Sequence, residues 1–448
     1  MISRAYRATR VNDVDWDRLA TGNDGLGVSL GIDVGKRELL AVCRWADARF
    51  ERPWRVHNPE EVPTLVALIR RMSAGRELVV AMESSGTYGD VLRQALSDAQ
   101  IAVVRVSNKA SRDYAEVFDG VPSQHDGKDA AVIAELAAMG KARPWAYQAA
   151  DDTDQELVYW VEWMVIHRQI LTTWQGRLEG LVARHWPEAT RVLKLSSVTL
   201  LRALGEYGDP RKLAEDPDAA SRLAAWGGPL LAADKVAQLV AEAGSSVGVR
   251  VGDRQRQQIR EYAAQALAAR REGERARRHL CELAKGNPVL RAQSQAVGVA
   301  TACVLWTSVG DPRQYPAEAA YRKAMGLNLV ERSSGAYKGQ LRISKRGDAR
   351  ARQWMYFAAL RLVQRSGVRE WFEAKKAGEK NDARRVVVAV MRKLAPALHQ
   401  VGVHGERFDP QRLFGGLGRR GGPTGSQGQG SDRRAASGGK TKVQRGSE

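Results

Sequence analysis

Two apolar runs of strand length that each end in a carboxylate constrain the fold of this chain more than any other feature. The first run is Leu26–Asp33 and the second is Leu78–Glu83. A third acidic pair, Asp126 and Asp129, opens a helical pattern and shares one helix face because its members are spaced i, i+3. Strands alternating with helices indicate an α/β unit in which strand ends and one helix can bring carboxylates together.

Residues 26–146 are therefore predicted to form a mixed sheet covered by helices, after an N-terminal extension at 1–25. Strands are expected at Leu26–Asp33, Glu38–Trp45, Trp54–His57, Leu78–Met82 and Ile101–Val106. Helices are expected at Val62–Arg71, Tyr88–Asp98 and Lys128–Met139. Three strands in succession before the alternation begins favour a mixed sheet over a Rossmann order.

Residues 147–287 are predicted to form a helical region. Gln155–His185 and Asp253–Leu283 have long helical periodicity and favour a coiled coil, whereas Leu200–Val247 indicates short helices broken by glycine and proline. Four tryptophans recur along the first long helix: Trp160, Trp163, Trp174 and Trp186. Their spacing indicates packing, with base stacking as the alternative.

A mostly helical third domain is predicted at 288–408. Helices are expected at Tyr315–Met325, Ala349–Gln364 and Ala383–Leu398. The segment around Gly298 is similar to the hairpin of a helix-hairpin-helix, whose backbone amides can face a phosphate. Residues 409–448 are rich in glycine, serine and arginine and are predicted to form a disordered basic tail.

The net charge of +19, from 70 Lys and Arg against 51 Asp and Glu, indicates a polyanionic partner such as nucleic acid. No apolar stretch reaches the ~20 residues that span a bilayer, so no membrane partner is expected. The three scattered cysteines, Cys43, Cys281 and Cys303, fit neither a disulfide framework nor a zinc cluster. The N-terminus has no apolar core, and we expect a cytoplasmic protein.

The four carboxylates suit a hard divalent cation. Oxygen donors favour Mg²⁺, with Mn²⁺ as a second possibility, and two such ions can stabilise both the attacking and the leaving oxygen at a phosphodiester. We therefore expect a metal site formed by Asp33, Glu83, Asp126 and Asp129. The alternative is that Asp126 only caps a helix and Glu83 is a loop carboxylate.

A second chemical signal lies in a segment dense in small and basic residues. Ser333 and Ser334 precede Gly335 there, and we expect a flexible loop that presents a hydroxyl to a phosphate. Neighbouring arginines and lysines could stabilise a pentavalent phosphorus. No histidine in the segment offers a general base, and the alternative is an ordinary basic loop that binds DNA.

These motifs together resemble the IS110 family of transposases, the RNA-guided bridge recombinases. In the first domain they are Gly31–Lys36, Met82–Tyr88 and Asp126–Ala130. In the third domain they are Gly298–Ala302, Ala324–Leu327, Arg332–Gly335 and Ile343–Asp348, in the order that the family shows. The resemblance covers nearly the whole chain before the tail.

The resemblance implies an RNase H-like, RuvC-like domain whose DEDD residues Asp33, Glu83, Asp126 and Asp129 hold Mg²⁺ during DNA cleavage. It implies that Ser334, or its neighbour Ser333, is the nucleophile that forms a 5′-phosphoserine. The implied partners are DNA, a non-coding guide RNA and further copies of the chain in a tetramer, in a bacterial cell at the nucleoid. Phosphates would be contacted by Lys345, Arg346, Arg350 and Arg352.

Two other functions compete with this interpretation. A metal-only nuclease of the Holliday-junction resolvase kind needs the four carboxylates and no serine. A catalytically inert nucleic-acid-binding protein needs neither, although the presence of all five residues argues against it.

Overall fold

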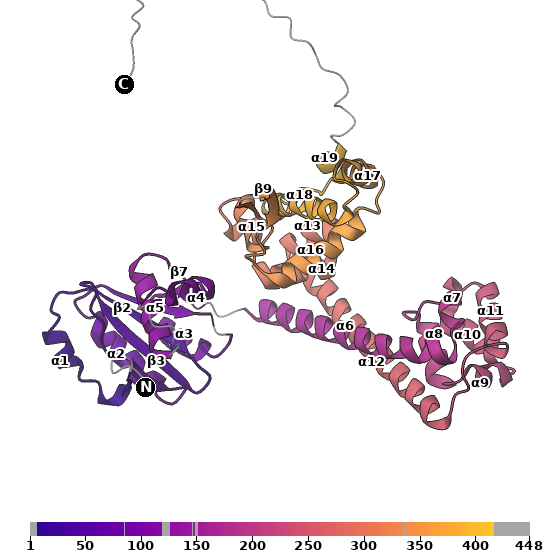
Figure 1. Cartoon of the computed structure of the whole chain (residues 1–448), viewed down its shortest axis with the longest axis horizontal. Coiled ribbons are helices and arrows are strands. Elements are labelled where there is room, and N and C mark those ends of the chain that lie inside the picture. Colours follow the sequence, from indigo (N-terminus) through magenta and orange to yellow (C-terminus); the bar gives the residue numbers. More distant parts are fainter. Residues whose placement is uncertain are drawn as a thin grey trace, which may run out of the picture. The chain divides into compact units, whose positions relative to one another are not determined.

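The computed structural model describes residues 7–84, 86–118, 126–145, 147, 151–334 and 337–415. The chain divides into two compact units, Met1–Ala149 and Ala150–Glu448 (Figure 1). The disorder predicted for the end of the chain falls mostly on residues 416–448, which lie outside the described residues.

A seven-stranded mixed sheet organises the first unit, which confirms the predicted mixed sheet. Its strands are β1 (Thr9–Arg10), β2 (Val28–Val34), β3 (Glu38–Trp45), β4 (Trp54–His57), β5 (Leu78–Glu83), β6 (Val103–Val106) and β7 (Arg143–Pro144). Their order is β1-β4-β3-β2-β5-β6-β7. The β2–β3 and β3–β4 pairs are antiparallel, whereas β2, β5 and β6 are mutually parallel. Helix α2 (Val62–Ser73) precedes β5 and helix α3 (Asp90–Asp98) precedes β6, as crossover connections to parallel strands require.

Helices cover both faces of this sheet. They are η2 (Val11–Asp13), α1 (Trp16–Thr21), α2 (Val62–Ser73), α3 (Asp90–Asp98), α4 (Asn108–Ala115) and α5 (Asp126–Ala138). Side chains alternate along each strand, so Leu30 and Ile32 pack with α2 and α3 while Ala81 and Val106 pack with α5. The predicted N-terminal extension contributes to this core, because Trp16 is buried and stacks on Trp45.

Two long antiparallel helices form the axis of the second unit. They are α6 (Asp152–His185) and α12 (Asp253–Gly286), and they lie side by side (Figure 1). Each end of the pair belongs to a different apolar core. The predicted tryptophan stripe packs: the Trp160 ring stacks on His279 at 3.9 Å, and Trp186 is buried. Whether the pair has coiled-coil packing stays a prediction.

Short helices form the core at one end of this axis. They are α7 (Ala189–Val192), α8 (Val198–Glu206), α9 (Pro210–Glu215), α10 (Ala219–Gly227), η3 (Gly228–Leu230) and α11 (Ala233–Gly244). Buried residues of these helices pack with Leu178 and Val182 of α6 and with Ile259 of α12. The glycine and proline breaks thus fold the linking segment back onto both long helices.

The core at the other end is the C-terminal bundle, which is mostly helical as predicted. Its elements are α13 (Pro288–Val297), α14 (Val299–Val309), η4 (Pro312–Gln314), α15 (Glu318–Ala324), β8 (Leu329–Ser334), β9 (Tyr337–Ile343), α16 (Ala349–Leu362), α17 (Val368–Gly378), α18 (Ala383–His404) and α19 (Pro410–Phe414). Gly298 joins α13 to α14 with a φ of 82°, so the helix-hairpin-helix segment is a single-residue turn followed by a helix.

Three features of this bundle differ from the sequence pattern. The segment expected as a flexible loop forms the antiparallel β8–β9 hairpin. The ordered fold continues past 408, because Phe414 of α19 is buried against Trp371. Among the residues that the structure describes, α18 is the one helix long and apolar enough to cross a membrane, and 56% of that stretch is buried. Its apolar face builds the bundle core.

Candidate active site

Two parallel strands carry Asp33 and Glu83 to the same edge of the sheet. In the β2–β5 ladder Ile32 is the partner of Met82, so Asp33 and Glu83 are the next residues on the two strands. Both point to the face opposite Ile32 and Met82, because side chains alternate along a strand. That is the face that α5 covers.

Helix α5 delivers the other two carboxylates because it lies very close to β2. A Cβ built on Gly31 would lie 2.2 Å from the Ala130 carbonyl oxygen and 2.4 Å from the Ala134 nitrogen, so only glycine fits there. The first turn of α5 holds Asp126 and Asp129. One carboxylate oxygen from each of three residues, Asp33, Asp126 and Asp129, lies within 4.8 Å of the others.

The electrostatics of this cluster favour its neutralisation. Burial is the largest cause that raises the pKa of the Asp33 carboxyl, from 3.8 to about 6. The charges of neighbouring carboxylates raise it further, in the order Asp129, Asp126 and Glu83. A proton or a cation at this position therefore relieves both the desolvation of Asp33 and the repulsion within the cluster.

Glu83 stands slightly apart from the other three. Burial raises the pKa of its carboxyl, and the charge of Asp129 acts in the same direction. The buried hydroxyl of Ser111 and the guanidinium of Arg112 favour its ionised form instead. Glu83 therefore couples electrostatically to the trio while it keeps polar neighbours of its own on α4.

The donor set fits a divalent cation. All donors are carboxylate oxygens, which hard cations such as Mg²⁺ and Mn²⁺ prefer. The three oxygens within 4.8 Å come from two rigid elements, β2 and α5, so they can bind a cation with little rearrangement. The cluster could hold such an ion next to Glu83.

The sequence pattern missed two polar neighbours of Glu83 and one buried lysine close in sequence to the aspartates. Ser111 and Arg112 lie on α4, a helix that the pattern did not predict, and Lys128 lies on α5 between the two aspartates and is only 3% exposed. Lys128 lies between Asp126 and Asp129 in the sequence, and this position could have identified it as a neighbour of the predicted metal ligands. The close contact between Gly31 and α5 could not be predicted from the sequence, because it depends on how the helix packs against the strand.

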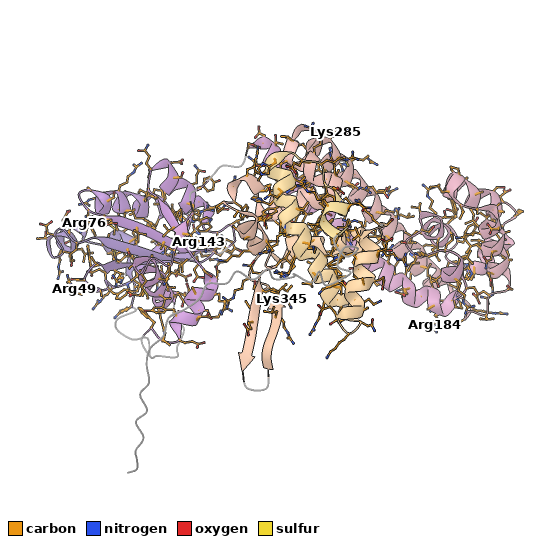
Figure 2. The ribbon with its side chains drawn as sticks, turned by 90° about the horizontal axis from the view of Figure 1, so that it is seen from above. Arg49, Arg76, Arg143, Arg184, Lys285 and Lys345 are labelled. Atoms are coloured by element: carbon orange, nitrogen blue, oxygen red, sulfur yellow. The ribbon has the colours of Figure 1, made fainter. Side chains whose placement is uncertain are left out.

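The predicted nucleophile lies in the second unit, on the hairpin. Ser334 is the last residue of β8, where its backbone pairs with Tyr337 beside an irregularity in the ladder. The side chains of Ser333 and Ser334 lie outside the described residues, as does Gly335. Figure 2 shows the hairpin projecting away from the bundle, with Lys345 near its base.

The four predicted phosphate contacts lie in two kinds of environment. Lys345 and Arg346 are exposed. Arg350 forms an ion pair with Glu162 of α6. Arg352 Nη1 donates to the Met325 carbonyl at 3.3 Å and to the carbonyls of Lys345 and Asp348. Arg352 therefore joins the start of α16 to the turn after α15.

Comparison with known proteins defines the class of this chain. Residues 30–187 match the family model of the IS110 DEDD transposases, described as transposase, and residues 290–377 match the transposase IS116/IS110/IS902 family. A relative from Streptomyces coelicolor, described as an insertion element IS110 uncharacterized 43.6 kDa protein, is 26% identical over 352 residues. That match covers 75% of this chain and 84% of the relative.

A solved structure of RuvC from T. thermophilus in complex with Holliday junction substrate is also similar, at 19% identity and a TM-score of 0.21. The match covers 27% of this chain and 99% of RuvC. The two family models and the relative define a DNA-cleaving and recombining enzyme with a DEDD domain. The chain belongs to the IS110 family of transposases.

Proposed function

We propose that this chain is the transposase of an IS110-type insertion sequence and exchanges DNA strands through a 5′-phosphoserine intermediate. The observation that carries the proposal is the convergence of Asp33, Asp126 and Asp129 in a chain of this family. A cluster of carboxylates with a raised pKa at Asp33 suits a divalent cation better than it suits a purely structural role.

In this proposal the acidic residues Asp33, Glu83, Asp126 and Asp129 hold Mg²⁺, or Mn²⁺ in its place. The bound cation would stabilise negative charge on the scissile phosphate and on the departing oxygen. The carboxylates position the cation on the sheet edge, and the close contact at Gly31 keeps α5 in register with β2.

Ser334 carries the covalent step, with Ser333 as the neighbouring candidate. Its Oγ attacks the phosphorus and loses its proton, the bond from phosphorus to the 3′ oxygen breaks, and that oxygen leaves as a 3′ hydroxyl after taking up a proton. A 3′ hydroxyl of another strand then attacks the phosphoserine and releases the serine. The exchange thus conserves the number of phosphodiester bonds.

The assembly is also part of the proposal. A non-coding RNA guides the choice of DNA, the functional oligomer is a tetramer in which one copy supplies carboxylates and another supplies serine, and the protein works at the nucleoid of a bacterial cytoplasm. The working divisions are 26–146 for the DEDD domain, with Trp16 packed onto its core, 147–287 for the helical region, and 288–408 for the serine domain, with α19 packed onto its end. Lys345 and Arg346 are exposed and available to phosphates.

A metal-only nuclease of the junction-resolvase kind is the second candidate. The observation that favours it is that the carboxylate cluster is complete within the first compact unit, whereas the serine lies in the other unit. Such an enzyme would hydrolyse the phosphodiester with water and leave no covalent protein–DNA species.

Separate substitutions test the proposal. Recombination is assayed on DNA that carries the ends of the encoding element, with the RNA transcribed from that element. Asp33→Ala and Ser334→Ala should each abolish recombination, while Ser334→Ala retains DNA and RNA binding. A fully active Ser334→Ala protein, combined with an active Ser333→Ala, Ser334→Ala double variant, would sink the serine mechanism.

A further inference from the structure

An open groove of about 430 Å³ lies at the base of the β8–β9 hairpin. Strand β9 and helices α16 and α18 form its walls. The lining includes apolar residues, polar groups from Gln353 and Tyr356, and one basic residue, Arg352. This volume falls in the range of sites that hold small organic ligands, ~300–1,000 Å³.

An exposed aromatic wall faces this groove. The Tyr356 ring is 37% exposed and lies edge-to-face with Phe357, with the ring centroids 6.3 Å apart. Gln353 lies one turn earlier on α16, on the same helix face, and its amide offers both donors and an acceptor. The Tyr356 ring can stack on a flat ring, and the Gln353 amide can hydrogen-bond to its edge, so the two residues together suit a planar ligand with polar edges.

Three arginines, Arg168, Arg277 and Arg361, lie near one another, and two of them contact or belong to α16. The Arg168 guanidinium lies over the Phe357 ring at 4.5 Å and over the Trp354 ring at 5.3 Å. Arg361 Nη2 donates to the Val297 carbonyl at 3.0 Å and to Thr301 Oγ1 at 2.8 Å. These contacts fix the Arg168 guanidinium over Phe357, which lines the groove, and fix the Arg361 guanidinium against α13 and α14, one helical turn beyond Phe357.

The positive charge of this group is not balanced locally. Burial, followed by the charges of Arg168 and Arg277, lowers the pKa of the Arg361 guanidinium. Among the described residues, none of the three arginines forms an ion pair with a carboxylate. A bound anion would relieve this repulsion, and arginine forks suit phosphate oxygens in particular.

We propose that the groove holds one unpaired nucleotide of a DNA or RNA strand, with its base on Tyr356 and its adjoining phosphates on Arg168 and Arg361. An aromatic face beside a positive surface is the arrangement that binds unpaired strands. A protein side chain could fill the apolar floor, but it would leave the three guanidiniums without a counter-charge.

The position of the groove relates this nucleotide to the hairpin. β9 runs from Tyr337, the backbone partner of Ser334, to Ile343, which lines the groove. Six strand steps correspond to ~20 Å. The nucleotide would thus anchor the strand at the opposite end of β9 from the serine of the same copy. The inference rests on the proposed function only for the class of ligand.

Binding measurements on the full-length chain, in chelator so that cleavage does not contribute, test the inference. The probes are fluorescent ten-nucleotide strands of thymidine DNA and of uridine RNA, an abasic strand of the same length, and a duplex. Tyr356→Leu should weaken binding of the strands that carry bases by about five- to tenfold and leave the abasic strand unchanged. Tyr356→Phe keeps the ring and should bind as the wild type does.

The responses of the DNA and RNA strands identify the source of the nucleotide. A Tyr356→Leu loss on DNA alone assigns an unpaired DNA nucleotide, a loss on RNA alone assigns RNA, and a loss on both assigns a site open to either. Tyr159→Leu is the matched aromatic control, because Tyr159 of α6 is 50% exposed and lies away from the groove lining.

Arg168→Gln should weaken binding of the base-carrying and abasic strands alike and reduce the salt dependence by about one phosphate contact. Arg254→Gln, at the start of α12, removes the same charge elsewhere. Equal affinities for Tyr356→Leu and Tyr159→Leu on every probe would overturn the inference. So would a change of oligomeric state in Tyr356→Leu with unchanged nucleic-acid affinity, because that result assigns the groove to protein contact.

This test separates the two proposals. Tyr356-dependent binding in a protein that never forms a phosphoserine contradicts only the proposed reaction. Recombination through Ser334 with no Tyr356-dependent binding contradicts only the nucleotide site. Thermal unfolding of each variant checks that the bundle is folded.

Discussion

The two halves of the proposed active site are built on elements of very different rigidity. The carboxylates lie on the central strands of a seven-stranded sheet and on a helix pressed against it. Ser334 lies at the end of a strand in a two-stranded hairpin, where Leu341 is 60% exposed. Two strands alone are marginally stable in water.

This difference in rigidity indicates that the two halves of the site reach their working geometry at different stages. A rigid sheet edge can hold like charges close together because the fold resists their repulsion. A hairpin with exposed apolar residues gains order when a strand of nucleic acid or another protein surface covers it. We infer that the metal half is formed in advance and that the serine half takes its final geometry on binding.

The largest expected effect comes from a substitution in the rigid half of the site, which holds Asp33, Glu83, Asp126 and Asp129. Asp129→Asn should lower strand cleavage by on the order of 100-fold or more, because it removes one charged donor from the trio. Manganese titration with magnetic resonance detection should show weaker binding in Asp129→Asn than in Glu83→Gln, whose carboxyl lies outside the trio. Asp98→Asn on α3 is the surface control, and equal losses in Asp98→Asn and Asp129→Asn would contradict the site.

A second change tests how much the rigid half depends on the contact between α5 and β2. Gly31→Ala places a Cβ against the backbone at Ala130 and Ala134, which cannot move without shifting α5. The free energy of unfolding of the first unit should fall by about 1–3 kcal/mol. Denaturant unfolding measures it, with Gly176→Ala as control, since that glycine lies in α6 with open space around it. A Gly31→Ala protein as stable as the wild type would refute the close contact.

A pH titration sharpens the electrostatic side of the comparison. The pKa of Asp33 is raised in the fold, so its contribution to stability is present below about pH 4 and is lost as pH rises through about 6. Without divalent cation, the melting temperature of the wild type should therefore fall across this window relative to Asp33→Asn. Magnesium should raise the melting temperature more at neutral pH than in acid. A wild type that gains stability relative to Asp33→Asn as pH rises would contradict the raised pKa.

The smallest expected effects come from the basic residues below the hairpin. Lys345→Gln and Arg346→Gln should weaken DNA binding modestly and reduce its salt dependence without changing stability, because both side chains are exposed. Arg352→Gln should instead destabilise the bundle, since its guanidinium donates to three carbonyls. Binding titrations at several salt concentrations and thermal melts distinguish these roles. Equal melting temperatures and equal DNA affinities for Arg352→Gln and Arg346→Gln would contradict a structural role for Arg352.

The sequence predicted the rigid half well because its signals are local. The apolar runs that end at Asp33 and Glu83 are strands β2 and β5, and the i, i+3 spacing of Asp126 and Asp129 places both on the first turn of α5. Strand ends and helix starts fix where a side chain projects, so convergence could be expected before any coordinates. The tight fit at Gly31 depends on tertiary contact and could not.

The sequence predicted the half that carries Ser334 poorly, because local sequence signals are weak there. The hairpin forms from a segment of small and basic residues, and its pairing of Leu329 with Ile343 spans residues that show no apolar alternation. Helix α4, with Ser111, and helix α17 are short and contain few apolar residues, so neither forms an apolar stretch long enough to predict a helix. Residues 409–414 have tail-like neighbours, yet Phe414 completes a core that only the fold reveals.

A covalent protein–DNA species, trapped during the reaction, distinguishes serine-mediated strand exchange from hydrolysis by water. The full-length chain is incubated with RNA from its element, element-end DNA labelled on one strand, and magnesium, and is then denatured and separated by size. We expect a labelled adduct that maps to Ser334, or to Ser333 as its neighbour, and that is absent in Asp33→Asn and in chelator. Metal-dependent cleavage that leaves the wild-type protein free of DNA would contradict serine-mediated strand exchange and assign the carboxylates to a hydrolytic nuclease.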